Sequence, residues 1–181
     1  MEQQGASKRD AGDEAMTART ERHRRMAETY LAEHQAMTKA HIEGRTPVLP
    51  TAIQSGPIEF YIPQRGDSIM ESGAHFADNG LPLRELQLYW RRIPDFGIKR
   101  YEIFVSETGW AQALYWGGTG EDGTIFNAEE VDIVKTDETF RVTRLEIYSD
   151  AKQWRELVAY VHHADAEQWV DGNYNELIGA H

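Results

Sequence analysis

The chain contains no cysteine, and this absence excludes several kinds of chemistry. Disulfide bonds, thiol nucleophiles and zinc sites built on thiolates are all ruled out. Long apolar runs are missing as well, since no segment approaches the roughly 20 residues that a membrane span needs. The N-terminus also lacks the apolar stretch of a signal peptide. The sequence therefore predicts a cytoplasmic protein that has no membrane partner.

Positive charge is in short supply. Lysine and arginine total 19 against 30 aspartates and glutamates, which gives a formal net charge of −11. Binding to a nucleic-acid backbone needs clustered Lys and Arg, so this balance argues against a nucleic-acid partner. The one basic cluster, from Arg19 to Arg25, is interrupted by Glu21 and is interpreted as the solvated face of a helix.

The composition is that of one soluble globular domain. Hydrophobic residues make up 40% of the 181 residues and aromatic residues 10%, which is enough for a substantial core. Residues 1–16 are polar, with no aromatic or β-branched side chain, and are expected to form a disordered tail. We expect the folded domain at residues 17–163 and a C-terminal extension at residues 164–181.

Periodicity and turn residues predict an α+β protein. A long helix should run from Thr17 to about Glu43 and end at Gly44, and a last helix should begin with Asp150 as its N-cap and Gln153 as the capping-box partner. A middle helix is expected after Asn79. Residues 64–80 are interpreted as a loop or a distorted strand. The predicted strands are Ile58–Pro63, Ile98–Ser106, Trp110–Trp116, Thr124–Val134 and Phe140–Tyr148.

This order of elements favours a strongly curved antiparallel sheet of four or more strands. The N-terminal helices would cover its concave face and the C-terminal helix would close it. The hollow between sheet and helices would be the natural place for a ligand. At the joint between the middle helix and the first long strand, Pro94 stops the helix and Gly97 permits the turn. Asp95 in this joint is interpreted as a turn residue rather than a catalyst.

Three segments resemble one known family. They are "GLPLRELQLYWRRIPDF", "WGGTGEDGTIF" and "FRVTRLEIYSD", which contain Pro94-Asp95, Trp116 and Asp150. They are similar to segments of the SnoaL-like polyketide cyclases, within the nuclear transport factor 2-like superfamily of α+β cones. The resemblance implies a reaction inside the cone without metal or organic cofactor. It also implies a homo-oligomer paired through the outer face of the sheet.

The first helix offers two proton-transfer groups. Tyr30, His34 and Met37 recur at spacings of three and four and so share one face. A phenol and an imidazole can each exchange a proton, and an apolar environment shifts their pKa values. The alternative is that Tyr30 only packs and that His34 faces solvent. His41, near the helix end, is interpreted as a partner of the helix dipole.

The last strand and its neighbour offer charged groups. Arg144 and Glu146 alternate with apolar residues and could form a pair inside the hollow, where Asp132 would face them. A paired carboxylate could act as a base and the guanidinium could stabilise an oxyanion. The alternative is an ordinary salt bridge on the wet outer face.

A phosphate loop and a metal site are not expected. The run "GGTGEDG" lies between two strands and lacks the Lys-Ser/Thr ending, so it is interpreted as a hairpin turn. The spacing of His34 and His41 is poor for a shared metal ion, and we expect no metal and no organic cofactor.

The sequence hypothesis is thus a cofactor-independent acid–base enzyme of the lyase or isomerase type. Dehydration, aldol-type cyclisation and retro-aldol cleavage would all fit. The substrate would be a hydrophobic, aromatic or polycyclic small molecule. A non-catalytic binding cone and an epoxide hydrolase remain as alternatives. The proposed catalytic residues are Tyr30, His34, Asp132, Arg144 and Glu146, and the proposed substrate-binding residues are Met37, Phe60, His75, Trp90, Tyr101, Trp116 and Tyr148.

Overall fold

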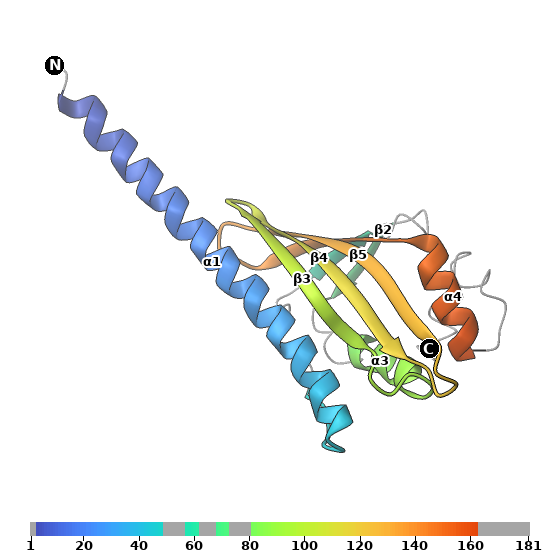
Figure 1. Ribbon diagram of the computed structural model, residues 1–181. Coiled ribbons are helices and arrows are strands. Elements are labelled where there is room, and N and C mark those ends of the chain that lie inside the picture. The colour runs from blue at the N-terminus through green and yellow to red at the C-terminus, as the bar shows by residue number, and fades with distance from the viewer. Residues whose placement is uncertain (1–2, 49–56, 62–67, 73–80, 163–181) are drawn as a thin grey trace.

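The computed structural model describes residues 3–48, 57–61, 68–72 and 81–162 (Figure 1). The helices are α1 (Gln3–Ile42), α3 (Leu81–Trp90) and α4 (Ala151–His162). The strands are β1 (Pro57–Tyr61), β2 (Ser68–Ser72), β3 (Gly97–Ser106), β4 (Gly109–Thr119), β5 (Ile125–Thr136) and β6 (Val142–Ser149). None of these helices is both long and apolar enough to cross a membrane.

The strands form one six-stranded sheet in the order β2-β1-β6-β5-β4-β3. All neighbouring pairs are antiparallel except β1 and β6, which are parallel. The predicted α+β cone is therefore confirmed, with the correction that its sheet is mixed. The sequence pattern could not show this, because a parallel pair needs only a long connection between its strands and leaves no local signal.

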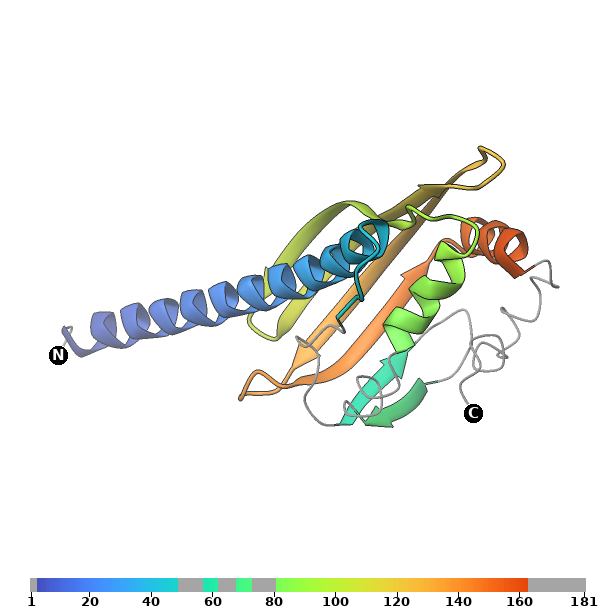
Figure 2. The same cartoon turned by 90° about the horizontal axis from the view of Figure 1, so that it is seen from below.

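The two faces of the sheet differ in what lies over them. Trp110, Gln112, Leu114 and Trp116 alternate along β4 and are all buried. Ring contacts join this side to the helices: His34 of α1 to Trp116, and Trp154 of α4 to Trp116. We call this side the covered face, and the opposite side the open face. Figure 2 shows α1 and α3 lying across the sheet on one side.

Helix α1 is longer than predicted. It begins at Gln3 rather than Thr17, so the described part of the expected disordered tail is helical and projects beyond the sheet (Figure 1). Alanine, glutamine, glutamate, lysine and arginine supply most of that segment, and such residues extend a helix that is already nucleated by packing. Its predicted end is confirmed: Gly44 has a φ of 67° and its N–H donates to the carbonyl of His41 over 2.9 Å.

A histidine that the sequence analysis did not single out anchors α1 to the sheet. His23 is fully buried and spans two strands, with Nδ1 2.7 Å from the Ser106 carbonyl and Nε2 2.7 Å from the Thr136 hydroxyl. Nearby, Arg19 donates to the carbonyls of Glu107 and Glu138, which belong to two different hairpin turns. These contacts hold the helix across the tips of both hairpins.

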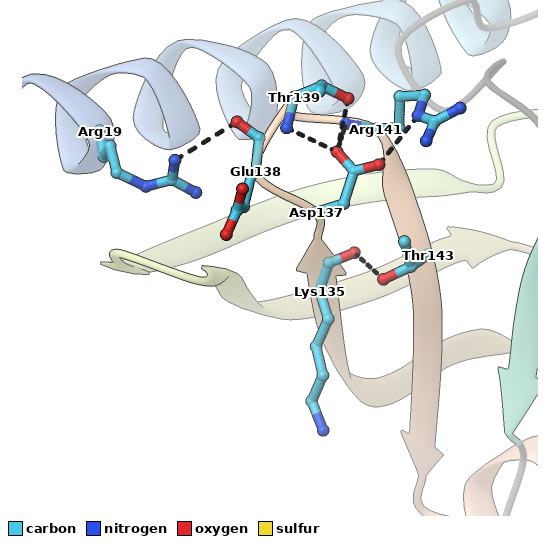
Figure 3. Close-up of polar contacts among 7 residues, drawn as sticks. All are labelled: Arg19, Lys135, Asp137, Glu138, Thr139, Arg141 and Thr143. Atoms are coloured by element: carbon cyan, nitrogen blue, oxygen red, sulfur yellow. Dashed lines mark hydrogen bonds and ion pairs between the residues drawn. The ribbon is translucent and has the colours of Figure 1, made fainter.

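The turn between β5 and β6 is held by one carboxylate (Figure 3). Asp137 accepts hydrogen bonds from the backbone N–H of Thr139 and Arg141 and from the Arg141 guanidinium. These bonds, with that from the Thr139 hydroxyl, hold the pKa of the Asp137 carboxyl well below its usual range. The ordered turn is what gives Arg19 the carbonyl of Glu138 to bind (Figure 3).

The joint after α3 has the structural role predicted for it. Asp95 accepts a hydrogen bond from the Thr119 N–H over 2.6 Å and forms an ion pair with Lys99. It thereby ties the start of β3 to the end of β4. Gly118 lies against this joint, and a Cβ atom there would be 2.5 Å from Ile93 Cγ2 and 2.9 Å from Phe96 Cα. Only glycine fits so close an approach.

The last helix begins as predicted but its capping box does not close. Asp150 accepts hydrogen bonds from the N–H groups of Lys152 and Gln153, which makes it the N-cap. The Gln153 side chain does not return to Asp150. Its Oε1 instead accepts from the Glu129 N–H over 2.8 Å and so attaches α4 to β5. The apolar stripe of α4 is buried as predicted, at Trp154, Leu157, Val158 and Val161.

Candidate functional site on the covered face

Two of the predicted proton-transfer residues lie together on the buried side of α1. Tyr30 and His34 are 6% and 5% exposed, and their ring centroids are 4.2 Å apart. The spacing of four residues places both on the buried side of the helix. The His34 ring also meets the edge of Trp116 on β4, at a centroid distance of 6.4 Å. His34 is thus enclosed, and the alternative that it faces solvent is wrong.

The protonation state of His34 follows from its surroundings. Burial lowers the pKa of His34 to about 4, although the Tyr30 carbonyl and the charge of Glu33 act in the opposite direction. The imidazole is therefore neutral at pH 7. A carbonyl oxygen can only accept, so Nδ1, which is 3.0 Å from the Tyr30 carbonyl, must carry the proton. The other nitrogen, Nε2, is then a hydrogen-bond acceptor.

Trp116 is packed among aromatic rings, and only 9% of its surface is exposed. The Phe96 ring stacks on it at 5.8 Å and the Trp154 ring meets it edge-on at 6.4 Å. Its indole Nε1–H is buried and has no hydrogen-bond partner within the described residues. A buried donor without a partner costs about 1–3 kcal/mol.

A second polar group lies further along the same face. Asp132, on β5, is 2% exposed and pairs in register with Gln112 on β4. Gln112 Nε2 donates to Asp132 Oδ2 over 2.9 Å, and Trp110 Nε1 donates to Gln112 Oε1 over 3.1 Å. This chain of side chains orients the carboxylate. The structure therefore places Asp132 on the covered face, as predicted.

The positions of these groups along β4 define the candidate site. Helix α1 follows the strand so that His23 lies beside Trp110 and His34 beside Trp116. Gln112 and Leu114 lie between these two ends of the strand. The buried carboxylate of Asp132 and the buried imidazole of His34 thus lie on one face. Asp132 lies beside Gln112 and His34 beside Trp116, so about four residues of β4 separate them. Such an arrangement can move a proton to or from a molecule held between them.

The register corrects the predicted placement of Arg144 and Glu146. Glu146 pairs with Ile133 and Arg144 with Lys135, which are the positions of β5 that alternate with Asp132. Both side chains therefore lie on the open face and do not join Asp132. A β-bulge causes the error: Lys135 pairs with Arg144, but the next residue, Thr136, pairs with Val142. Val142 and Leu145 are consequently both buried although they are three residues apart.

On the open face, Arg144 and Glu146 belong to a network of ion pairs and hydrogen bonds. Arg144 binds Glu59 through Nη1 and Glu146 through Nε, each over 2.7 Å. Lys135 Nζ lies 3.0 Å from Glu146, and the Tyr148 hydroxyl donates to it over 2.8 Å. Burial favours a higher pKa, but the donors Tyr148, Lys135 and Arg144 outweigh it and lower the pKa of Glu146 to about 2. Such a carboxylate is a poor base at neutral pH.

The predicted substrate-binding residues are distributed over both faces. Met37 and Trp90 are buried in the core, and the Trp90 ring stacks on His41 at 4.3 Å and donates to the Phe96 carbonyl. Tyr101 pairs in register with Leu114 but is 40% exposed, so it is not enclosed. The prediction for Tyr148 is corrected, because it belongs to the open face. Phe60 pairs in register with Leu145, and His75 lies outside the described residues.

Sequence reasoning missed Gln112 as part of the site. Glutamine in the middle of an apolar strand, between Trp110 and Leu114, is a signal that could have found it, because a buried amide needs a partner. Within the described residues no group of three or more His, Asp or Glu could hold a metal ion.

No protein-family model matches the chain, and no curated protein is similar to it in sequence. Similar solved structures do exist. A candidate isomerase from Bacillus subtilis superposes with a TM-score of 0.50 at 13% identity, covering 78% of this chain and 95% of its own. A protein with a ketosteroid isomerase-like fold from Catenulispora acidiphila superposes at 0.47 with 9% identity, covering 78% and 95%. A nuclear transport factor 2-like protein of unknown function from Burkholderia pseudomallei superposes at 0.49 with 11% identity, covering 77% and 97%.

These similarities concern the fold. At identities near 10% a shared backbone does not carry a shared reaction, because the same scaffold hosts many sites. The structure from Bacillus subtilis therefore shares the α+β fold of this chain, with its curved sheet and covering helices.

Proposed function

We propose that this protein is a cofactor-independent acid–base enzyme of the isomerase or lyase type. Its substrate is a hydrophobic, aromatic or polycyclic small molecule held against the covered face. One observation carries the proposal: a buried carboxylate, Asp132, and a buried neutral imidazole, His34, share one face of the sheet. Buried titratable groups are costly to maintain and concentrate at functional sites.

The geometry supports a division of roles between these groups. Asp132 is the general base, because Gln112 fixes one of its oxygens over 2.9 Å. His34 cannot donate through Nε2 in the tautomer set by the Tyr30 carbonyl, so it accepts a hydrogen bond or a proton from the substrate. With Arg144 on the open face, the phenol of Tyr30 is the group left to stabilise a developing oxyanion.

The aromatic surroundings of His34 support an apolar substrate. Tyr89, Phe96, Trp116 and Trp154 form one connected set of ring contacts beside His34. Rings offer large apolar contact areas at little entropic cost. The epoxide hydrolase alternative requires two carboxylates bridged by an arginine inside the hollow. Arg144 does bridge Glu59 and Glu146, but on the open face.

The proposal is tested by hydrogen exchange at a carbon acid. Dehydration of a β-hydroxy carbonyl compound, aldol-type cyclisation and isomerisation each begin when a proton is removed next to a carbonyl, and retro-aldol cleavage forms the same kind of enolate when the C–C bond breaks. Exchange of the α-protons of 2-tetralone for deuterium, followed by NMR in D₂O, reports that step directly. The wild-type protein should accelerate the exchange, and Asp132→Asn should reduce the acceleration by about 10²–10⁴-fold.

Glu146→Gln is the matched control. It neutralises a buried carboxylate on the neighbouring strand, but on the open face, and should leave the exchange rate unchanged. An Asp132→Asn protein that is folded and exchanges at the wild-type rate would refute the assignment of the base. If 2-tetralone binds but its exchange is not accelerated, the protein is a binding cone and the enzymatic proposal fails.

A further inference from the structure

The side-chain amide of Gln112 has a single orientation, because its partners at both ends permit no other. An indole N–H can only donate, so the Gln112 atom that lies 3.1 Å from Trp110 Nε1 is the carbonyl oxygen. The amide NH₂ group therefore points at Asp132, and Nε2 donates to Oδ2 over 2.9 Å. Two hydrogen bonds thus run in one direction, from the indole through the amide to the carboxylate. We call these three side chains the relay.

The relay is shielded from water. Trp110 and Asp132 are each 2% exposed, and Gln112 is fully buried. Burial by itself favours the neutral form of a carboxyl group, whereas a hydrogen bond donated to a carboxylate favours the charged form. Hydrogen bonds that point the same way polarise one another in a low-dielectric interior. The indole therefore strengthens the bond that the amide donates to Asp132.

Satisfying a buried indole does not require this arrangement. Trp90, which is also buried, donates to the backbone carbonyl of Phe96, and no titratable group is involved. Trp110 donates instead to a side chain whose other end meets a buried acid. Replacing both partners of a buried hydrogen bond by apolar groups of the same shape can leave stability nearly unchanged. The property that distinguishes the relay is therefore its effect on the acid.

We infer that Trp110 is a positioning residue for the general base of the covered face. Its N–H holds the carbonyl oxygen of Gln112, which turns the amide NH₂ group towards Asp132 and keeps the carboxylate ionised and oriented. Trp110 acts through Gln112 and does not have to touch the substrate. This inference rests on the proposed function and adds the group that prepares the base.

Helix α1 fixes the start of the relay. The His23 ring lies against the Trp110 ring at a centroid distance of 6.3 Å, and its two nitrogens are bonded to Ser106 and Thr136. The indole is therefore packed beside a side chain that joins α1 to the ends of β3 and β5. In this way the packing of α1 on the sheet supports the ionised state of the buried acid.

Trp110→Phe tests the relay, because it keeps an aromatic ring and removes the donor. Exchange of 2-tetralone is measured with the full-length protein from pH 5 to 9. We expect kcat to fall about fivefold to tenfold, as for one lost hydrogen bond, and KM to stay within about twofold. The acid limb of the kcat profile should move to higher pH, because a carboxylate with a weakened donor is protonated more readily.

Two substitutions at the middle of the relay keep the test decisive if Trp110→Phe does not fold. Gln112→Met breaks both hydrogen bonds at a similar side-chain volume, so it should move the acid limb in the same direction and further. Gln112→Glu leaves an acceptor for the indole but faces Asp132 with a second carboxyl group. Two adjacent carboxyl groups resist ionising together, so the acid limb should again move to higher pH.

Tyr160→Phe is the matched control. Its hydroxyl, on α4, donates to the carboxylate of Asp122 over 3.0 Å, so the substitution also removes a donor that an aromatic side chain gives to an acid. Neither residue belongs to the relay. The kcat value and its pH profile should therefore stay as in the wild type.

The carboxyl carbon resonance of Asp132 provides a measurement that does not depend on catalysis. It is identified in ¹³C NMR spectra by its absence from Asp132→Asn and is followed from pH 8 to pH 5. The carboxylate should stay ionised to lower pH in the wild type than in Trp110→Phe or Gln112→Met, because both variants weaken or remove its donor.

The outcomes separate this inference from the proposed function. Identical carboxyl curves in the wild type and both variants overturn the role of Trp110. A loss of stability with an unchanged kcat and an unchanged pH profile overturns it as well, since that is the result of a purely structural contact. If the wild type does not accelerate exchange but the carboxyl curves differ as expected, the relay is supported and only the catalytic proposal fails.

Discussion

Acidification should destabilise this protein through His34, and the size of the effect follows from its burial. The pKa of His34 is about 4 in the folded protein against 6.5 in an exposed histidine. A histidine with a lowered folded pKa binds more protons when unfolded, so its contribution to the free energy of unfolding is lost as pH falls from 6.5 towards 4. The difference of about 2.5 pKa units corresponds to about 3 kcal/mol at 1.36 kcal/mol each.

The loss has a defined course with pH. Linkage gives about 2 kcal/mol lost between pH 7 and pH 5 and about 3 kcal/mol by pH 4, and little change above pH 7. This is a large share of the stability of a domain, which is typically about 5–15 kcal/mol.

The assay is urea unfolding of wild type and His34→Gln at pH 7, 6, 5 and 4. Other titrating groups, including Glu146 and His23, are common to both proteins and cancel in the difference. His34→Gln lacks the titrating ring, so its free energy of unfolding should fall less, and the gap between the two proteins should change by about 2 kcal/mol between pH 7 and 5. A gap that stays constant within about 0.5 kcal/mol, the usual limit of additivity, would refute the claim that His34 is buried and neutral.

Three further predictions follow from close contacts. Gly118→Ala should lower the free energy of unfolding by about 1–3 kcal/mol in thermal denaturation, because its Cβ would be 2.5 Å from Ile93 Cγ2, and an unchanged midpoint would contradict the close approach. His23→Phe should increase hydrogen–deuterium exchange of α1 amides, because it removes both bonds to the sheet, and wild-type protection would show that His23 does not anchor the helix. Glu146→Gln should destabilise the protein by about 1–3 kcal/mol at pH 7, where the carboxylate is ionised, and the difference should shrink as pH falls from 4.5 towards 2; a difference independent of pH would exclude the ionic network as its source.

The joint after α3 shows how much local chemistry can predict. A proline, a carboxylate and a glycine within residues 94–97 predicted the turn and the start of the strand at Gly97, whereas the helix α3 ends earlier than predicted, at Trp90. The contact of Asp95 with the Thr119 N–H then confirmed its structural role. Gly44 and Asp150 were predicted as helix boundaries for the same reason, since capping depends on residues within one turn of each other.

The active-site predictions on the last strand failed for a different reason. Alternation along a strand separates two sets of residues but does not say which set faces the helices. In β6 the bulge near Thr143 also breaks the alternation, so that Val142 and Leu145 are both buried. The face that carries Arg144 is fixed by pairing with β5 and β1, and these strands come from distant parts of the chain.

The sequence by itself determined the element types, most of their boundaries and the helix face that carries Tyr30 and His34, because these depend on residues within a few positions of one another. Only the tertiary structure decided that His34 is neutral with its proton on Nδ1, that Asp132 shares its face, and that Arg144 and Glu146 do not. Burial, tautomer and strand register are set by contacts between segments far apart in the chain, and no local pattern of residues specifies them.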